Sequence, residues 1–250
     1  MSKSKEPIEE LDWRHRVATF ITQDSLSPRG EVLYKKGTPV SVTTFAKYKN
    51  IEIGFGDPSA TALFLNQAHK SFVVAKELNP FQKKTIERKE NILTAKVYDY
   101  LEAISASIIF SHTALEAFAN EEIPDNFVYE VEETAESGLI VVKYYDKEQL
   151  ERKFSLSEKL ASVLPKAMNL PSPKGEKIWD GFVYLRRLRD RLIHLKSKDR
   201  AHSKHDNMYP ESIWSTLLNP EQKNYPLIAK SIILHFKKID SAHWLKYCPF

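Results

Sequence analysis

The sequence has little cysteine and no long apolar run. Cys248 is the single cysteine among 250 residues, so no disulfide can form within the chain, and a reducing compartment is favoured. No stretch reaches the roughly 18 consecutive apolar residues that a membrane-spanning helix needs, and the first residues lack the apolar core of a secretory signal. These absences favour a cytoplasmic protein that makes no contact with a membrane.

Glycine is also scarce, with 7 residues in the whole chain, and it forms no nucleotide-binding loop. The stretch IGFGDPSA (residues 53–60) lacks the third glycine of a dinucleotide fingerprint and the Lys-Ser/Thr ending of a phosphate-binding loop. Asp57-Pro58 is instead typical of a helix start, with aspartate as N-cap and proline in the first helical position. We therefore expect no cofactor.

The composition is that of a folded chain with a small excess of positive charge. Hydrophobic residues make up 42% and charged residues 28% of the sequence, and the formal net charge is +4. The excess favours an anionic partner, although solvated helix faces also carry such charge. The basic residues gather in three places, at Lys83, Lys84, Arg88 and Lys89, at 186–191, and at Lys196, Lys198 and Arg200.

Periodicity predicts a mainly α-helical protein. Residues 1–56 form an N-terminal extension of short strands or loops, and residues 57–250 form a helical domain. Within that domain we expect helices at 59–78, 94–120, 156–168 and 173–198, with Pro165 kinking or ending the third. A β-hairpin is predicted at about 127–145, between two helices. The helix at 94–120 carries one buried stripe formed by Val97, Leu101, Ile104, Ile108, Ser111, Leu115 and Phe118.

The helix at 173–198 has a divided polar side. At about 100° per residue, Arg187, Asp190, Arg191, His194 and Lys198 fall on one polar stripe opposite the apolar arc. Arg189 is the exception, because it projects from within that arc. Its charge cannot be lost, so the side chain must reach solvent, pair with an acid, or line a cleft between two elements or two subunits.

Residues 189–194, RDRLIH, resemble the motif of HEPN domains, in which an arginine and a polar residue precede a histidine by a short spacing. Arg187 also has an allowed spacing to His194, but Asp190 directly after Arg189 fits the motif better. The stretch SHTALEAFANEEI (residues 111–123) is similar to a helix of several HEPN-like proteins. In it His112, Glu116 and Asn120 follow each other at i,i+4 spacing. A metal pair of His112 and Glu116 is not favoured because no third ligand is evident.

The resemblance implies an up-down helical bundle and a homodimer in which two motif helices form one composite site. It further implies a metal-independent endoribonuclease of a toxin–antitoxin or anti-phage system, with an antitoxin or other defence protein as a further partner. His194 would be the general acid or base in attack of the RNA 2′-hydroxyl, Arg189 would hold the phosphate, and Asp190 would orient them. Glu116 would pair with Arg189, supported by Asn120 and Arg187. The expected RNA contacts are Arg186, Arg191, Lys196 and Lys198.

Two alternatives remain open from the sequence. A HEPN-like module could bind RNA or a protein partner without cutting, or an unrelated helical regulator could bind DNA through the same charges. HEPN toxins that are paired with nucleotidyltransferase antitoxins often carry a tyrosine two residues after the histidine, as the target of inactivating nucleotidylation. Lys196 occupies that position here, so control by that route is not expected.

Overall fold

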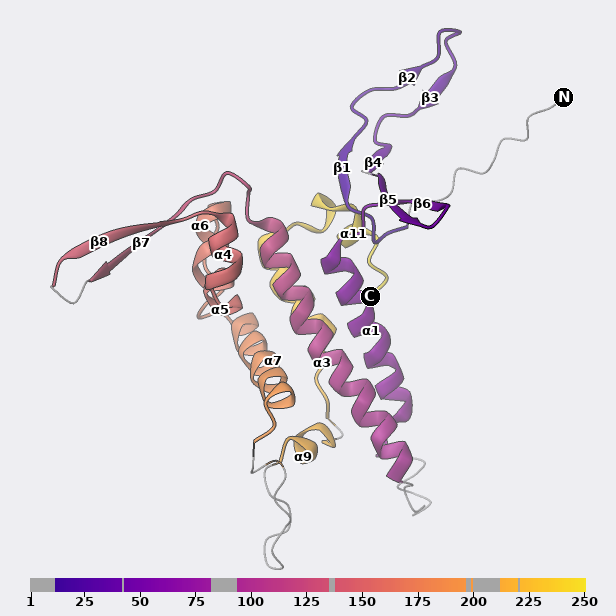
Figure 1. The fold of residues 1–250 in the computed structure, drawn as a ribbon. Helices are drawn as coiled ribbons and strands as arrows, with labels where there is room; N and C mark the ends of the chain where they lie inside the picture. Colours follow the sequence, from indigo (N-terminus) through magenta and orange to yellow (C-terminus); the bar gives the residue numbers. More distant parts are fainter. Residues whose placement is uncertain are drawn as a thin grey trace, which may run out of the picture. The chain divides into compact units, whose positions relative to one another are not determined.

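The computed structural model describes residues 12–41, 43–81, 94–134, 138–196, 199, 212–219 and 221–250, and it is mainly α-helical, as predicted (Figure 1). The chain forms two compact units. One comprises the residues up to Leu63 together with Lys238–Phe250, and the other comprises Phe64–Lys237. The predicted helical domain thus includes two segments, 57–63 and 238–250, that the structure groups with the N-terminal strands. No helix among the described residues is long and apolar enough to cross a membrane.

The first unit contains short antiparallel ribbons. β1 (Val17–Phe20) pairs with β4 (Pro39–Ser41), and β2 (Ser25–Leu26) pairs with β3 (Val32–Tyr34) as a nested second pair. β5 (Thr43–Tyr48) and β6 (Ile51–Gly56) form a separate hairpin. The unit also holds a 3₁₀ turn, η2 (Ile239–Ser241), and α11 (His243–Lys246).

Helix α1 (Ala60–Leu78) begins slightly later than its sequence pattern suggested. The Ser59 hydroxyl accepts a hydrogen bond from the Ala62 backbone N–H at 3.2 Å, so Ser59 is the capping residue. Asp57 instead lies 3.8 Å from the Arg16 guanidinium. The expectation that Asp57 caps this helix is therefore wrong by two residues.

The core of the second unit is built around α3 (Thr94–Glu122). Helices α7 (Lys177–Ile193) and α10 (Tyr225–Phe236) pack against α3. The short helix α9 (Ile213–Leu217) lies near the N-terminal part of α3. Ile104, Ile108, Ser111, Leu115 and Phe118 of the predicted stripe are buried, whereas Val97 and Leu101 remain partly exposed. Each fully buried side chain of leucine size contributes about 1.5–3 kcal/mol.

Two aromatic contacts connect α1, from Phe64 onward, to this core. Phe64 of α1 stacks on Phe110 of α3 with ring centroids 6.2 Å apart, and Phe72 meets Tyr225 of α10 edge-to-face. The hydroxyl of Tyr100 on α3 donates to the Leu217 carbonyl at 2.8 Å, and burial raises the pKa of this phenol to about 12. These contacts thus join α3 to α1 and α9, and α1 to α10.

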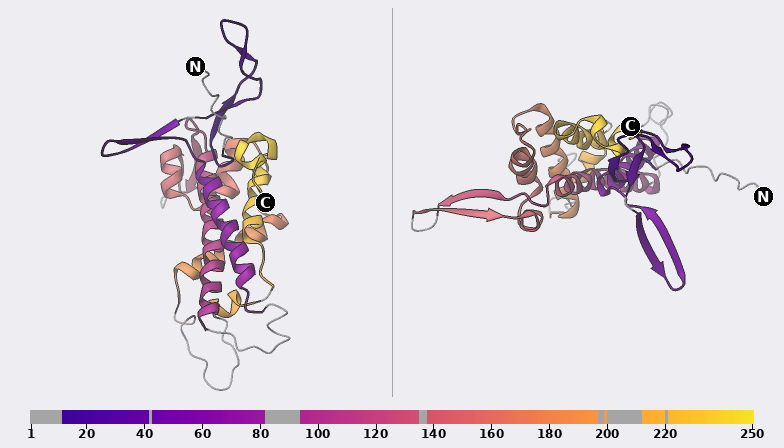
Figure 2. Two further views of the ribbon diagram at one scale, coloured as in Figure 1. Left: turned by 90° about the vertical axis from the view of Figure 1, so that its right-hand side faces the viewer. Right: turned by 90° about the horizontal axis from the view of Figure 1, so that it is seen from above.

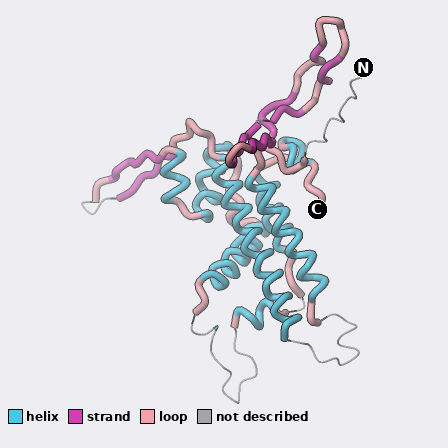
Figure 3. Tube along the Cα trace, turned by 45° about the vertical axis from the view of Figure 1, so that its right-hand side comes forward, coloured by secondary structure: helices cyan, strands magenta, loops and turns pink. Residues whose placement is uncertain are grey.

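The predicted hairpin is confirmed. β7 (Tyr129–Thr134) pairs with β8 (Ile140–Tyr145) in antiparallel register from Tyr129 opposite Tyr145 to Thr134 opposite Ile140. The hairpin projects from the helices of its unit (Figures 2 and 3). Its base is held by Phe154, whose ring meets those of Tyr129 and Tyr145 edge-to-face.

The helical segment after the hairpin contains a π-turn. α4 (Lys147–Lys153) is followed by α5 (Leu156–Glu158), a π-helical turn η1 (Lys159–Val163) and α6 (Leu164–Met168). Pro165 has no N–H to donate to the Ala161 carbonyl, which instead accepts from the Ser172 hydroxyl at 2.7 Å. The Leu164 N–H donates five residues back, to Lys159. Pro165 therefore reshapes the helix without ending it.

Helix α7 is shorter at both ends than predicted. It starts at Lys177 after a turn closed by the Glu176 N–H on the Pro173 carbonyl, and it packs closely on α10 at Gly181. A Cβ at Gly181 would lie 3.3 Å from the Ile228 side chain. The helix ends at Ile193, so His194 lies just beyond it with φ −115° and ψ 65°.

Candidate functional site

Six predicted site residues line one surface hollow on α7. The hollow has a volume of about 530 Å³. Four of its polar side chains are cationic, one is a carboxylate and one is an imidazole. The lining consists of Val183, Arg186, Arg187, Asp190, Arg191, His194 and Lys196. The excess of cations over carboxylates makes this hollow a place where an anion is attracted.

His194 enters the hollow from the end of the helix. Its side chain is exposed, and its backbone N–H donates to the Asp190 carbonyl at 2.9 Å. The carboxylate of Asp190 has Arg189 as its ion-pair partner among the described residues. The implied role of Asp190 in orienting His194 is therefore not supported by a side-chain contact among the described residues, because α7 ends at Ile193 and the carboxylate pairs with Arg189.

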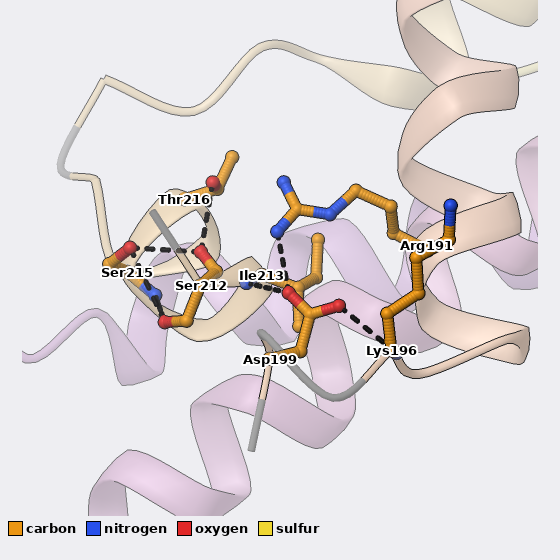
Figure 4. A network of polar contacts seen from close by, with 7 residues as sticks. All are labelled: Arg191, Lys196, Asp199, Ser212, Ile213, Ser215 and Thr216. Carbon is orange, nitrogen blue, oxygen red and sulfur yellow. Dashed lines mark hydrogen bonds and ion pairs between the residues drawn. The ribbon is translucent and has the colours of Figure 1, made fainter. Parts of the chain in front are cut away.

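The Asp199 carboxylate binds the backbone just beyond the end of α7, where the chain leaves the helix (Figure 4). The Asp199 carboxylate accepts hydrogen bonds from the Arg191 guanidinium at 2.6 Å, from the Ile213 N–H at 2.8 Å and from the Lys196 N–H at 3.2 Å. In a continuing helix the Lys196 N–H would bond to the Leu192 carbonyl instead. The side chain of Asp199 is fully buried, so the end of α7 is tied to the start of α9.

Arg191 is consequently a structural cation. Its side chain is only 20% exposed and carries the charge that neutralises Asp199. Burial disfavours the ionised form of Asp199, yet the hydrogen bonds from Arg191 and from two backbone N–H groups lower the pKa of the carboxyl overall. The expectation that Arg191 serves as an RNA contact must therefore be revised, since its guanidinium is engaged inside the fold.

Arg186 and Arg187 keep charges that no carboxylate partner neutralises within the described part of the chain. Arg186 donates a hydrogen bond to the Ser157 hydroxyl. Arg187 is exposed, and its guanidinium lies 5.6 Å from the centroid of the Tyr184 ring. A cation–π contact of this kind positions a guanidinium while leaving its N–H donors available. Both arginines are thus able to bind an anion.

Arg189 lies outside the lining of the hollow. Its side chain is 34% exposed, and the guanidinium contacts the Asp190 carboxylate at 3.1 Å. Arg189 is thus partly exposed, and its ion-pair partner among the described residues is Asp190. Asp190 lines the hollow and also pairs with Arg189, so it links Arg189 to the hollow within one chain.

The predicted ion pair between Glu116 and Arg189 is wrong. Glu116 and Asn120 instead accept hydrogen bonds from the ammonium of Lys159, each at 2.9 Å, and the Glu151 carbonyl accepts a third at 3.0 Å. Lys159 is completely buried. Glu116 and Asn120 therefore stabilise a buried lysine at the π-turn, which is a structural role.

The sequence patterns did not identify Lys159 and Asp199 as partners of the predicted site residues. For Lys159, however, the sequence contained an indication. Lys159 precedes Val163 by four residues, and Leu160, Val163 and Leu164 are all fully buried, so the lysine interrupts an apolar face. A cation on such a face requires nearby acceptors. Asp199 gave no comparable signal, because it follows a run of polar residues.

His112 of α3 is a further residue of this region. It is only 6% exposed, and the charges of Arg189, Asp190 and Arg186 on α7 and of Glu116 on α3 act on it. Burial lowers the pKa of its imidazole, and Arg189 adds to that effect. The i,i+4 spacing put His112 on a polar stripe beside the buried one, but the His112 side chain is itself buried.

Two further points concern Lys198 and metal binding. Lys198 lies outside the described residues. Among the residues that are described, no group of three His, Cys, Asp or Glu side chains has an arrangement suited to a metal ion.

Comparisons of the chain with protein-family models, with characterised proteins and with solved structures found no match, so the HEPN resemblance remains a prediction.

Proposed function

We propose that this chain is a metal-independent endoribonuclease that binds RNA in the hollow on α7, in a toxin–antitoxin or anti-phage role. The observation that carries the proposal is the hollow itself, where the His194 imidazole shares one lining with Arg186, Arg187 and Lys196. Arginine and lysine bind phosphate oxygens, and histidine exchanges protons near neutral pH. RNA supplies the phosphate, and its 2′-hydroxyl supplies the nucleophile.

The proposed reaction needs no group from outside the chain and its substrate. The 2′-oxygen attacks the adjacent phosphorus and loses its proton, the bond from phosphorus to the 5′-oxygen breaks, and the 5′-oxygen gains a proton. The products are a 2′,3′-cyclic phosphate and a 5′-hydroxyl end. His194 transfers a proton in this sequence, while the cations offset the charge that develops on the phosphoryl oxygens.

A site that uses both Arg189 and His194 requires a second copy of the chain, because Arg189 does not line the hollow of its own chain. This version is tested by complementation. Arg189→Ala and His194→Ala chains are co-expressed, so that half of the dimers are mixed, and the composite site of each mixed dimer keeps one Arg189 and one His194. We expect partial recovery, up to about half of the wild-type activity. Recovery of no activity would place the site within single chains.

The main test is cleavage of single-stranded RNA in EDTA by the full chain. We expect a 2′,3′-cyclic phosphate product, strong loss of cleavage in His194→Ala, and no cutting of RNA with a 2′-deoxy sugar at the scissile position. Lys177→Ala is the matched control, since Lys177 is an exposed cation on the same helix but outside the hollow. Undiminished cleavage by His194→Ala, or a 5′-phosphate product, would contradict the proposed chemistry.

A second candidate function is RNA binding without cleavage. This function is favoured because the hollow of a single chain offers one imidazole. Cleavage needs two proton transfers, from the 2′-oxygen and to the 5′-oxygen, and the second has no assigned group. In this case RNA binds, Arg187→Ala weakens binding, and no product forms at any pH. Equal affinity for single-stranded RNA and for duplex DNA would favour a DNA-binding regulator instead.

A further inference from the structure

The Tyr184 ring on α7 has two cations beside it that come from different parts of the chain. The Lys223 ammonium lies 4.4 Å from the centroid of this ring, and the Arg187 guanidinium lies 5.6 Å from it. The two charges are therefore no more than about 10 Å apart. Lys223 directly precedes the N-cap of α10, and α10 packs on α7, which is how the two cations come to share one ring.

The backbone that carries Lys223 is held by the side chains on either side of it. The amide nitrogen of Gln222 lies 2.7–3.1 Å from three backbone carbonyls within 216–219, and its amide oxygen accepts from the Tyr225 hydroxyl at 2.5 Å. Asn224 is the N-cap of α10. The Lys223 side chain itself is exposed. A cation on such a fixed segment loses less freedom when it binds than one on a mobile loop.

No carboxylate neutralises either cation within the described part of the chain. Arg187 and Lys223 form no ion pair there, not even with Glu221, which is exposed on the same connection as Lys223. The Tyr184 ring attracts both charges through its face, but it leaves their N–H donors available. Because two like charges held near each other repel, an anion that follows them lowers the energy of the arrangement.

We propose that Lys223 is a phosphate contact for RNA, and that a strand bound in the hollow continues past Tyr184 to reach it. Arg187 connects the two places, since it lines the hollow and lies beside the same ring as Lys223. Lys223 is outside the lining of the hollow, so it contacts a different phosphate from Arg187. The proposal rests on the RNA-binding part of the proposed function and does not require cleavage.

The test measures the affinity of the full chain for single-stranded 2′-O-methyl RNA, which has no free 2′-hydroxyl and cannot be cut, over a range of salt concentrations. Lys223→Gln should reduce the slope of log K against log salt by about 0.7 and weaken binding about fivefold at 0.1 M salt, the effect of one lost phosphate contact. Lys153→Gln is the matched control. Lys153 on α4 is also an exposed lysine beside a tyrosine ring, 5.5 Å from the centroid of Tyr145 and outside the hollow.

The double variant Arg187→Gln/Lys223→Gln tests whether the two cations contact different phosphates. In that case the slope should fall by about 1.4, because two counter-ion releases are lost. A fall of only about 0.7 would mean that both cations share one phosphate, and it would overturn the continued strand. Duplex DNA forms the second arm, and an equal slope change with duplex DNA would overturn the assignment to an RNA strand.

The remaining outcomes separate this contact from the proposed function. A wild-type slope in Lys223→Gln, together with a reduced slope in Arg187→Gln, would overturn the contact and leave the hollow as the RNA site. Equal losses in Lys223→Gln and Lys153→Gln would overturn it as a general charge effect. Absence of RNA binding by the wild-type chain would overturn both proposals. The expected losses in a chain that cuts no RNA would support the contact while contradicting cleavage.

Discussion

The buried lysine at the π-turn makes Glu116 a stability residue, and Glu116→Gln tests this role. The Lys159 side chain has 0% exposure, and among the described residues Glu116 is its one charged acceptor, beside Asn120 and the Glu151 carbonyl. The substitution keeps an acceptor oxygen but removes the counter-charge. Breaking a buried ion pair from one side costs about 3–5 kcal/mol. We expect about 3 kcal/mol here, because Glu116 is itself 39% exposed and partly screened.

For a unit the size of Phe64–Lys237, each kcal/mol lowers the Tm by about 2–4 °C, so Glu116→Gln should lower it by about 6–12 °C. Thermal unfolding followed by circular dichroism measures this change. Glu148→Gln is the control, since Glu148 is 78% exposed and pairs with Arg152 on the surface. Its effect should stay below about 1 kcal/mol.

A second substitution distinguishes loss of the counter-charge from other effects of Glu116→Gln. Adding Lys159→Met removes the buried charge itself, so the double variant should melt at a higher temperature than Glu116→Gln alone. The reasoning is refuted if Glu116→Gln melts at the same temperature as Glu148→Gln. It is also refuted if the folded Glu116→Gln chain loses RNA cleavage or binding, because Glu116 would then act in the site.

Three further predictions concern the hollow, the end of α7 and the hairpin. Arg187→Ala should weaken RNA binding and reduce the slope of log K against log salt by about 0.7, the change expected for one phosphate contact. Lys177→Ala should leave that slope unchanged. Asp199→Asn should destabilise the fold at neutral pH. Because the folded-state pKa of Asp199 is lowered, its contribution is present above about pH 4 and is lost as the pH falls. Urea unfolding of wild type and Asp199→Asn should therefore converge at acid pH, and an equal gap at pH 7 and at the acid limit would contradict the assignment. Phe154→Ala removes two edge-to-face contacts, to Tyr129 at 5.7 Å and to Tyr145 at 5.0 Å, each contributing about 0.5–1.5 kcal/mol. Limited proteolysis should then cut the hairpin faster than in Tyr144→Ala, and equal rates would show that Phe154 does not hold it.

Local patterns predicted the elements whose stability depends on neighbours in the sequence. The stripe of α3 was readable because residues three and four positions apart share a helix face, and the hairpin was readable because two apolar runs flank a short polar connection. The end of α7 was not readable in this way. Its polar and apolar positions continue in helical spacing to residue 198, but the carboxylate of Asp199 competes for the backbone N–H groups. That competition arises from tertiary burial, which periodicity does not report.

The site residues divide along the same line. The predicted cationic residues beside His194 line one hollow because they are close in sequence, so their grouping follows from local spacing. Glu116 pairs with Lys159, which is 43 positions away along the chain, and Arg191 pairs with Asp199, which is 8 positions away. Pairings of this kind depend on which helices pack together. The spacing of charges on a single helix therefore predicted where the cations gather but misassigned the partners that neutralise them.

This distinction changes how the basic stretch at 186–191 should be interpreted. Arg191 neutralises a buried carboxylate, so its loss would be expected to unfold the end of α7 and to abolish RNA binding indirectly. Arg186, Arg187 and Arg189 contact a hydroxyl, an aromatic ring and an adjacent exposed carboxylate, and these contacts leave their charge available. Loss of binding in one of these three variants, with an unchanged Tm, identifies a phosphate ligand. The same loss in Arg191→Ala would not, because a drop in Tm would accompany it.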